Sequence, residues 1–507
     1  MAETKKKATT AKAAPKAKAV APNESTVKEK QVKPTPAKEP VKAEKPAKPA
    51  PAKKEMPEEA KPSSGPKSNE VLLSVRHLKQ FFRIGMGMKT KAVNDVSFDV
   101  YRGEVFGLVG ESGCGKTTTG RSIIKLYNIT GGQITFKDTV ISAGTRWNEK
   151  EIKFTRIRLK KKLDQLAADE KNELDDAGTD SNMVEAIKER YANLVHEEQA
   201  KAEAHIREQE LRIKEHRYDA KHGCKDWTKA HVEKVKAEWA DKIKAFRSEP
   251  HTTKEKLAFD KQYFMALHRA RHEKIMSSMQ MIFQDPISSL NPRMTVREII
   301  AEGLTIKGIR DKEYVNKRVL EVLDMVGLLP EHATRYPHEF SGGQRQRIGI
   351  ARAIIMNPEL IIADEPISAL DVSIQAQVIN LLNEIRQKMN ISILFIAHDL
   401  SVVKYFCDRI GVMYYGKMVE LASSEELFRH PLHPYTKSLI SAIPLPDPHY
   451  EKHRKRIVYN SAISHDYSKQ KPSFREVLPG HFIYCNEPEF AKYQEEIKNL
   501  DKKVDEE

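Results

Sequence analysis

The segment that most constrains this chain is residues 110–117, with the sequence Gly-Glu-Ser-Gly-Cys-Gly-Lys-Thr. It matches G-x-x-x-x-G-K-[ST], a pattern typical of a phosphate-binding loop. The apolar residues 105–109 predict a buried strand before it, and residues 118–126 predict a helix after it. A glycine-rich turn there directs backbone N–H groups into one concavity, and the helix N-terminus adds partial positive charge. We therefore expect nucleotide phosphates to bind the loop residues Gly110, Glu111, Ser112, Gly113, Cys114, Gly115, Lys116, Thr117 and Thr118.

Two carboxylates further along the chain complement this loop. Residues 360–363 are apolar and predict a buried strand, which ends in Asp364 and Glu365. Lys116 is expected to reach the β- and γ-phosphates of ATP, and Thr117 to ligate Mg²⁺ together with Asp364. Glu365 follows one residue later, where a carboxylate can polarise a water molecule for attack on the γ-phosphate. ATP and Mg²⁺ are therefore the predicted cofactors.

Two further polar residues each follow a predicted strand. Gln284 comes after the strand that begins at residue 278, and His398 ends the apolar run 391–397. Strands and helices alternate through this region, which predicts a parallel α/β sheet with ligand groups at the carboxyl ends of its strands. Gln284 and His398 are expected there beside the γ-phosphate, and Gln284 also beside the metal.

Composition limits the classes of protein that the chain could belong to. It has 507 residues and a net charge of +15, which favours an anionic partner or solvated basic tails. No apolar run approaches the roughly 18 residues of a membrane span, and the charged N-terminus lacks the apolar core of a signal peptide. The four cysteines are far apart and form no C-x-x-C pair, which indicates reduced thiols. These features predict an intracellular protein.

The composition also divides the chain into five stretches. Residues 1–68 are rich in Lys, Ala and Pro and cannot bury enough apolar surface to fold, so we expect a disordered extension. Residues 69–146 contain the phosphate loop, and residues 71–78 and 92–100 within this stretch alternate as strands of a half-buried antiparallel sheet. Within residues 69–146, Phe82 is the preferred candidate for stacking on adenine, with core packing as the alternative. The remaining stretches are 147–275, 276–449 and 450–507.

Residues 147–275 differ in character from the rest. Lys, Glu, Ala, Arg and His dominate, and apolar residues recur at helical spacing in narrow stripes, as at Leu159, Leu163 and Leu166. Residues 175–180 and Pro250 are natural breaks. This pattern predicts an inserted helical hairpin or small bundle whose apolar stripes pack helix against helix.

Taken together, the order of these motifs resembles the nucleotide-binding domain of ABC transporters. The phosphate loop is followed by Gln284, by Phe-Ser-Gly-Gly-Gln at residues 340–344, by the two carboxylates, by Ser-Ala-Leu-Asp at residues 368–371 and by His398. The segments at residues 283–295, 336–340 and 430–436 are more specific. They are similar to the ATP-binding subunits of oligopeptide and dipeptide permeases, most closely the subunit designated F.

This resemblance implies a fold and a way of working. The fold is an ABC-type P-loop domain with a parallel-sheet core, an antiparallel β subdomain and a helical subdomain. Two such domains face each other head to tail, so that the signature residues of one bind the γ-phosphate held by the other. The residues of this chain that the resemblance assigns to nucleotide contact are Ser341, Gly342, Gly343, Gln344 and Asp371.

The resemblance also implies partners and a location. A second ATPase subunit, of the D type, completes a heterodimer, and two membrane-spanning permease subunits bind above it. An extracellular substrate-binding protein takes part indirectly, and no nucleic acid is expected. The chain would then lie at the cytoplasmic face of the cell membrane and energise oligopeptide import by hydrolysing ATP.

The chain departs from the family in three places. The N-terminal extension and the insertion are additional, and the insertion is compatible with contact to a partner, to the membrane surface or to neither. Relatives carry clustered cysteines near the C-terminus, whereas only Cys485 stands here, so no iron–sulfur cluster is predicted. Residues 450–507 are predicted either to pack near the ATPase core or to form a loose tail. The alternative function is the ABC-type ATPase head of a DNA-maintenance protein.

Overall fold

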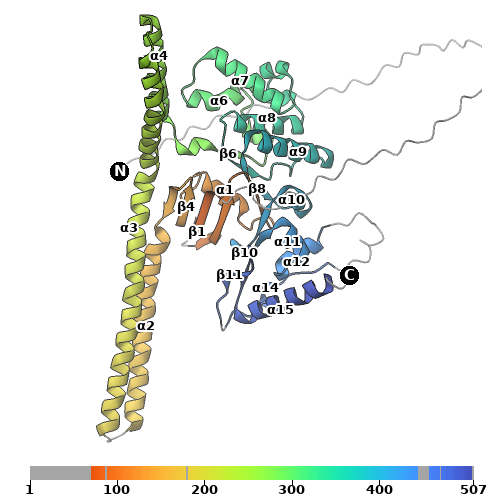
Figure 1. Cartoon of the computed structure of the whole chain (residues 1–507). Coiled ribbons are helices and arrows are strands. Elements are labelled where there is room, and N and C mark those ends of the chain that lie inside the picture. The colour runs from red at the N-terminus through yellow and green to blue at the C-terminus, as the bar shows by residue number, and fades with distance from the viewer. Residues whose placement is uncertain (1–69, 86–87, 178–180, 444–455, 469, 505–507) are drawn as a thin grey trace, which may run out of the picture. The chain divides into compact units, whose positions relative to one another are not determined.

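The computed structural model describes residues 70–85, 88–177, 181–443, 456–468 and 470–504 (Figure 1). The predicted disordered extension, residues 1–68, lies outside the described residues. None of the helices within the described ranges is both long enough and apolar enough to span a membrane.

The core is a mixed sheet of eight strands. Its order is β11-β12-β10-β9-β3-β8-β7-β6, with β9, β3, β8, β7 and β6 parallel to one another and the other three strands joined antiparallel. The strands are β3 (Val105–Val109), β6 (Met279–Ile282), β7 (Leu360–Asp364), β8 (Ser392–Ala397), β9 (Arg409–Tyr414), β10 (Lys417–Ser423), β11 (Ser473–Leu478) and β12 (His481–Cys485). All residues of β3, β7 and β8 are buried, which explains their continuous apolar sequences.

A second, antiparallel sheet has the order β2-β1-β4-β5. Its strands are β1 (Val71–Gly85), β2 (Met88–Tyr101), β4 (Gly131–Phe136) and β5 (Thr139–Gly144). The rings of Phe98 on β2 and Phe106 on β3 stack at 4.9 Å, which ties this sheet to the core. The two sheets confirm the predicted α/β architecture with its antiparallel subdomain.

Helices surround the core sheet and form a helical subdomain after β6 (Figure 1). Residues 296–325 form two helices and not one, because Gly308 at φ +79° turns the chain and Asp311 caps the second helix. The helices are α1 (Lys116–Ile123), α5 (Pro286–Ser289), α6 (Val296–Ile306), α7 (Lys312–Met325), α8 (Gly342–Ile354), α9 (Val372–Met389), α10 (Leu400–Phe406), α11 (Ser424–Arg429), α12 (Pro434–Ser441), α14 (Ser461–Ser464) and α15 (Glu487–Val504), with 3₁₀ turns η1 (Ile275–Ser278), η2 (Pro330–Thr334) and η3 (Pro337–Glu339).

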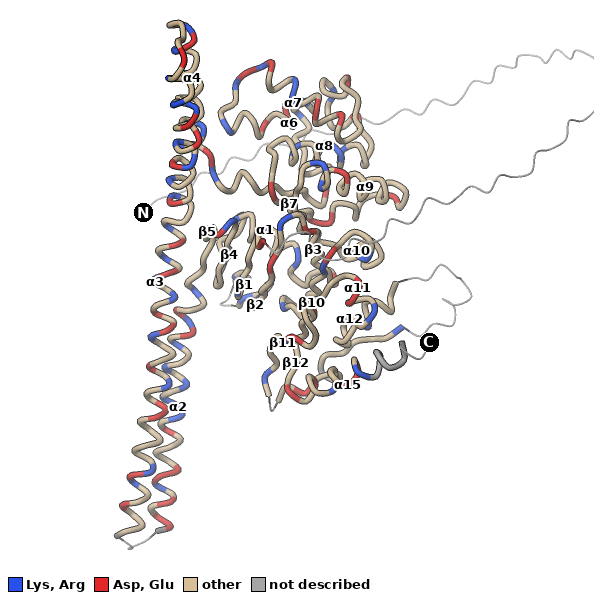
Figure 2. The backbone as a smooth tube through the Cα atoms, viewed as in Figure 1, with Lys and Arg blue, Asp and Glu red and all other residues tan. Residues whose placement is uncertain are grey.

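The inserted stretch forms three helices, α2 (Arg146–Ala177), α3 (Ser181–Ser248) and α4 (Thr253–His272). Figure 1 shows α2 running alongside the first part of α3, and Figure 2 shows charged residues of both signs along both helices. Leu166 of α2 and Tyr191 of α3 are buried. At the other end of α3, Phe246 stacks on Phe259 of α4 with ring centroids 4.1 Å apart. The apolar stripes therefore hold helix against helix.

The insertion rests on the antiparallel sheet. Asn148 of α2 donates to Gln209 of α3 at 2.9 Å, and both side chains are buried at this junction. At Gly223 of α3, an added Cβ would lie 2.4 Å from the carbonyl oxygen of Val140 on β5, so the helix approaches the strand closely because this residue is glycine.

The C-terminal extension completes the core sheet. β12 pairs with β10, and β11 pairs with β12, so residues 473–485 form part of the core sheet and not a loose tail. Glu420 of β10 is fully buried and accepts hydrogen bonds from the backbone N–H groups of Leu432 and His433 at 2.8 and 3.1 Å. His481 of β12 lies 2.9 Å from the same carboxylate.

Candidate functional site

The phosphate loop connects β3 to α1 through three glycines with positive φ. Gly110, Gly113 and Gly115 have φ of +147°, +82° and +106°, a region that residues with a side chain seldom adopt. A Cβ on Gly115 would lie 2.2 Å from the carbonyl oxygen of Ala92, and one on Gly110 would lie 2.2 Å from that of Met413. The loop is therefore held between β2 and β9 with no room for side chains at these two positions.

Lys116 is folded over the loop from the first residue of α1. Its ammonium donates to the carbonyl oxygens of Gly110 and Glu111 at 2.7 and 2.9 Å, and the side chain is buried. Cys114 is also buried, and burial raises the pKa of its thiol, so it remains protonated. The loop thus presents one fixed positive charge together with its backbone N–H groups.

Asp364 faces the loop from the end of β7. Thr117 donates its hydroxyl to Asp364 Oδ1 at 2.7 Å. The side chain is fully buried, and its other oxygen, Oδ2, has no hydrogen-bond partner among the described residues, with Arg121 3.7 Å away. Burial raises the pKa of Asp364, which the hydrogen bond from Thr117 opposes.

These donors fit Mg²⁺. A buried carboxylate oxygen without a partner, next to a threonine hydroxyl, belongs to the set of hard oxygen ligands that this ion prefers. Within the described ranges, no group of three or more His, Cys, Asp or Glu side chains is arranged to hold a metal ion.

Three side chains from three different strand ends meet above the loop. Gln284 donates to Glu365 Oε2 at 3.0 Å, and His398 Nδ1 lies 3.2 Å from the same oxygen. They line a cavity of about 330 Å³ together with Ala92 and the loop residues Ser112, Gly113, Gly115, Lys116, Thr117 and Thr118. Glu365 has φ of +45°, an uncommon backbone conformation for this residue type that aims its side chain toward the other two. The structure therefore brings Gln284, Glu365 and His398 together at the phosphate loop.

Other residues predicted from the sequence lie elsewhere. Ser341 caps α8, where its hydroxyl accepts from the N–H of Gln344, and none of residues 341–344 lines the cavity. Asp371 precedes α9 and is exposed. The Phe82 ring packs against Tyr127 with centroids 5.2 Å apart and does not line this cavity either.

One residue that supports the loop, Tyr435, was not predicted from the sequence. The backbone N–H of Glu111 donates to the hydroxyl of Tyr435 at 2.9 Å, and Tyr435 is buried. The Tyr435 N–H in turn donates to His433 Nδ1 at 3.1 Å. Burial, with His465 nearby, lowers the pKa of His433 to about 3, so it stays neutral and accepts this bond. Both residues belong to the segment 430–436 noted above, which gave no indication of this contact.

Family models match most of the chain. The model described as ABC transporter matches residues 93–234 and 242–368. The model described as oligopeptide/dipeptide transporter, C-terminal region, matches residues 419–471, the stretch that contains Tyr435. These matches favour the transporter branch over the DNA-maintenance alternative.

Curated relatives agree with these models. The chain is 43% identical over 425 residues to the oligopeptide transport ATP-binding protein OppF of Bacillus subtilis, which covers 84% of this chain and 99% of that protein. It is 39% identical over 426 residues to the dipeptide transport ATP-binding protein DppF of Lactococcus lactis, covering 83% of this chain and 96% of the relative. The phosphate loop and its carboxylates match the ABC transporter model, the C-terminal region matches the peptide transporter model, and the similarity to curated relatives extends over more than four fifths of the chain. The chain is therefore a member of the ABC-type ATPases that form the ATP-binding subunits of oligopeptide/dipeptide transporters.

Proposed function

We propose that this chain binds Mg²⁺ and ATP as one of two unlike ATPase subunits, and that its hydrolysis of ATP energises the import of oligopeptides. The observation that carries this proposal is the separation of two half-sites. The phosphate loop shares its cavity with Gln284, Glu365 and His398, whereas the signature residues at the start of α8 do not line it.

The loop side of the site binds and orients the nucleotide. Lys116 exchanges its two backbone acceptors for the β- and γ-phosphates, and the loop N–H groups bind the same oxygens. Thr117, Asp364 and Gln284 would hold Mg²⁺, which supplies positive charge against the charge that develops on the phosphates. Phe82 remains the proposed adenine contact.

Glu365 acts as the general base. Gln284 and His398 both contact its Oε2, and its Oε1 makes no hydrogen bond within the described part of the chain. Fixing one oxygen in this way leaves the other to accept the proton of an attacking water, while His398 and Gln284 hold the carboxylate in place.

The signature half serves a second nucleotide. Ser341 caps a 13-residue helix whose first turn contains Gly342, Gly343 and Gln344; Ser341 and Gly342 are exposed, and the N–H groups and the helix dipole at this end attract phosphate. We propose that this turn and Asp371 contact the γ-phosphate bound by the D-type ATPase subunit, and that ATP closes the pair. Two membrane-spanning subunits and an external substrate-binding protein complete the transporter, with this chain at the cytoplasmic face of the membrane.

Substitution of Glu365 by Gln tests the proposal. This change keeps the shape of the side chain and an acceptor for Gln284, but removes the base, so hydrolysis should fall by about 10²–10⁴-fold. ATP should still bind and should accumulate closed heterodimers, visible by size-exclusion chromatography with the co-expressed partner. Glu384→Gln, an exposed change on α9, is the matched control and should leave both properties intact. Hydrolysis within tenfold of the unaltered protein would exclude Glu365 as the base.

A further inference from the structure

A second cavity, of about 540 Å³, lies where insertion helix α2 begins beside the hairpin that joins β1 to β2. The hairpin contributes Arg83 and Lys89 to its lining, and the first turns of α2 contribute Arg146, Lys150 and Lys153. We refer to these five side chains as the basic cluster. The cavity shares no lining residue with the cavity at the phosphate loop.

The charge of the basic cluster is not compensated by acidic residues. Glu149 is the one carboxylate in the lining, and it pairs with Arg217 at 2.9 Å. Within the described ranges, no side chain of the cluster takes part in an ion pair. The nearby Lys89 lowers the pKa of Lys150, with burial and the Arg83 charge acting in the same direction. Like charges are thus held close together at this site.

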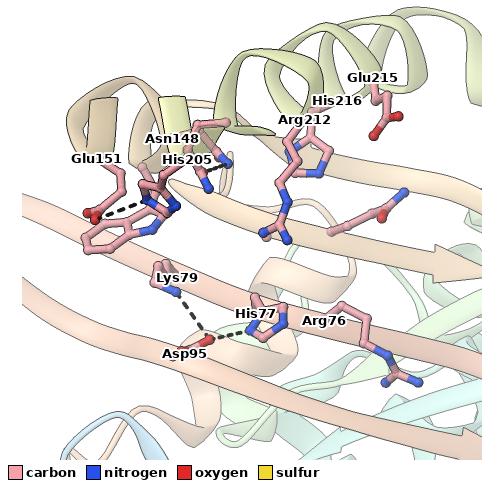
Figure 3. Close-up of a pocket in the computed structure, with 14 residues that line it drawn as sticks. Arg76, His77, Lys79, Asp95, Asn148, Glu151, His205, Arg212, Glu215 and His216 are labelled. Atoms are coloured by element: carbon pink, nitrogen blue, oxygen red, sulfur yellow. Dashed lines mark hydrogen bonds and ion pairs between the residues drawn. The ribbon is translucent and has the colours of Figure 1, made fainter. Parts of the chain in front are cut away.

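A neighbouring cavity at the same junction shows the opposite arrangement. It lies between the antiparallel sheet and α3, and Figure 3 shows Lys79 and His77 both directed at Asp95. Each Lys or Arg that lines it has an acidic partner: Arg76 with Asp99 at 2.7 Å, Lys79 with Asp95 at 3.2 Å and Arg212 with Glu208 at 2.7 Å. Ion pairs therefore neutralise the Lys and Arg side chains of this neighbouring cavity, whereas the cavity of the basic cluster stays positively charged.

Helix geometry makes the cluster more unusual. Arg146, Lys150 and Lys153 are spaced i, i+4 and i+7, so they lie along one face of α2. They occupy the first turns of a 32-residue helix, where the helix dipole disfavours positive charge. Mutual repulsion and the dipole both oppose this arrangement, so folding stability does not account for it.

Gln80, which lines this cavity, has a buried polar atom without a hydrogen-bond partner among the described residues. The residue is only 5% exposed, and the atom without a partner is its Oε1. Buried polar atoms are normally hydrogen-bonded. A ligand hydroxyl or amine would satisfy this oxygen while its anionic group met the cations.

We propose that the basic cluster binds a phosphate-bearing ligand at a site apart from the phosphate loop, in a cavity that Phe82, the proposed adenine contact, also lines. Phosphate oxygens accept charge-assisted hydrogen bonds from ammonium and guanidinium groups, and the charge of the ligand removes the repulsion within the cluster. The phosphate belongs either to a free polyphosphate or to the headgroup of an anionic lipid. Because α2 belongs to the insertion, the ligand would connect the insertion to the β1–β2 hairpin.

Two triple variants of the full chain test this site. The first, R146Q/K150Q/K153Q, removes three charges of the cluster. The second, K160Q/K161Q/K162Q, removes three exposed lysines from the same helix and is the matched control. With the phosphate loop saturated by a non-hydrolysable ATP analogue, inorganic tripolyphosphate is titrated by calorimetry. In parallel, phosphatidylcholine vesicles with and without phosphatidylglycerol are co-sedimented with each protein.

We expect the first variant to weaken binding by at least about tenfold and the control by less than about twofold. Loss in the tripolyphosphate arm alone identifies a free polyphosphate, and loss in the vesicle arm alone identifies a lipid headgroup. Lys89→Gln on the hairpin should weaken the same arm, which shows that the effect does not come from altered folding of α2. Equal losses in both triple variants, or no binding in either arm, would overturn the proposal.

Discussion

The phosphate loop offers a sharp test because two of its glycines share a left-handed backbone but differ in the space around them. Gly113 and Gly115 both have positive φ, at +82° and +106°. A Cβ on Gly113 would meet no atom within 4 Å, whereas a Cβ on Gly115 would lie 2.2 Å from the carbonyl oxygen of Ala92 on β2. Comparing alanine at the two positions therefore separates backbone strain from steric overlap.

The expected magnitudes follow from these geometries. Alanine with a left-handed backbone costs about 1–2 kcal/mol, and this cost applies at both positions. At Gly115 the overlapping atom belongs to the backbone of a strand, so β2 must shift, which adds about 1–3 kcal/mol. Gly113→Ala should thus lower the free energy of unfolding by about 1–2 kcal/mol, and Gly115→Ala by about 2–5 kcal/mol.

Hydrogen exchange of the core strands is the suitable assay. All three tryptophans, Trp147, Trp227 and Trp239, lie in the insertion, so their fluorescence would follow the wrong part of the chain. Amide exchange in β7 and β8, without nucleotide, reports the opening of the core, and about tenfold faster exchange corresponds to 1.4 kcal/mol. Equal acceleration by the two variants would refute the described fit of the loop against β2.

Three further predictions concern the surroundings of the loop. Tyr435→Phe removes the acceptor for the Glu111 N–H, so it should cost about 1 kcal/mol and raise the Kd for ATP severalfold, whereas Tyr459→Phe in the same aromatic cluster should not. Burial lowers the pKa of His433 from 6.5 to about 3, so the stability that the neutral side chain contributes is complete above pH 6.5 and is lost as the pH falls toward 3. In His433→Asn, the free energy of unfolding should therefore fall less steeply between these pH values, by up to about 1.4 kcal/mol per pH unit, as acid unfolding would show. Asp364→Asn removes a buried charge, so thermal unfolding should show a more stable metal-free protein, and calorimetry a loss of Mg²⁺-dependent ATP binding.

The sequence predicts the parts of the site that depend on local patterns. The loop is a contiguous motif, and its strand and helix lie directly beside it. The meeting of Gln284, Glu365 and His398 could also be predicted, because β6, β7 and β8 are adjacent parallel strands whose carboxyl ends share one edge. The geometry of parallel sheets was therefore enough to predict that these three side chains lie together, although it gave no distances between them.

Contacts between distant segments could not be predicted in this way. Tyr435 lies 324 residues from Glu111, and no local pattern connects a tyrosine in the first turn of a helix to a backbone N–H of the loop. β12 is a five-residue strand whose partner is about sixty residues earlier, so its place in the sheet depends on pairing and not on propensity. In the sequence, the residues that α2 contributes to the basic cluster are only part of a charged helix. The cluster becomes apparent once the structure places α2 beside the β1–β2 hairpin.

The central claim is that this chain supplies the phosphate loop for one ATP and the signature for another. The most direct measurement is cross-linking of a Ser341→Cys variant, in the Glu365→Gln background and with the partner subunits co-expressed, mapped by mass spectrometry with and without ATP. We predict an ATP-dependent link from residue 341 to the phosphate loop of the second ATPase subunit. A link to the phosphate loop of the same chain, or a pattern unchanged by ATP, would contradict the account.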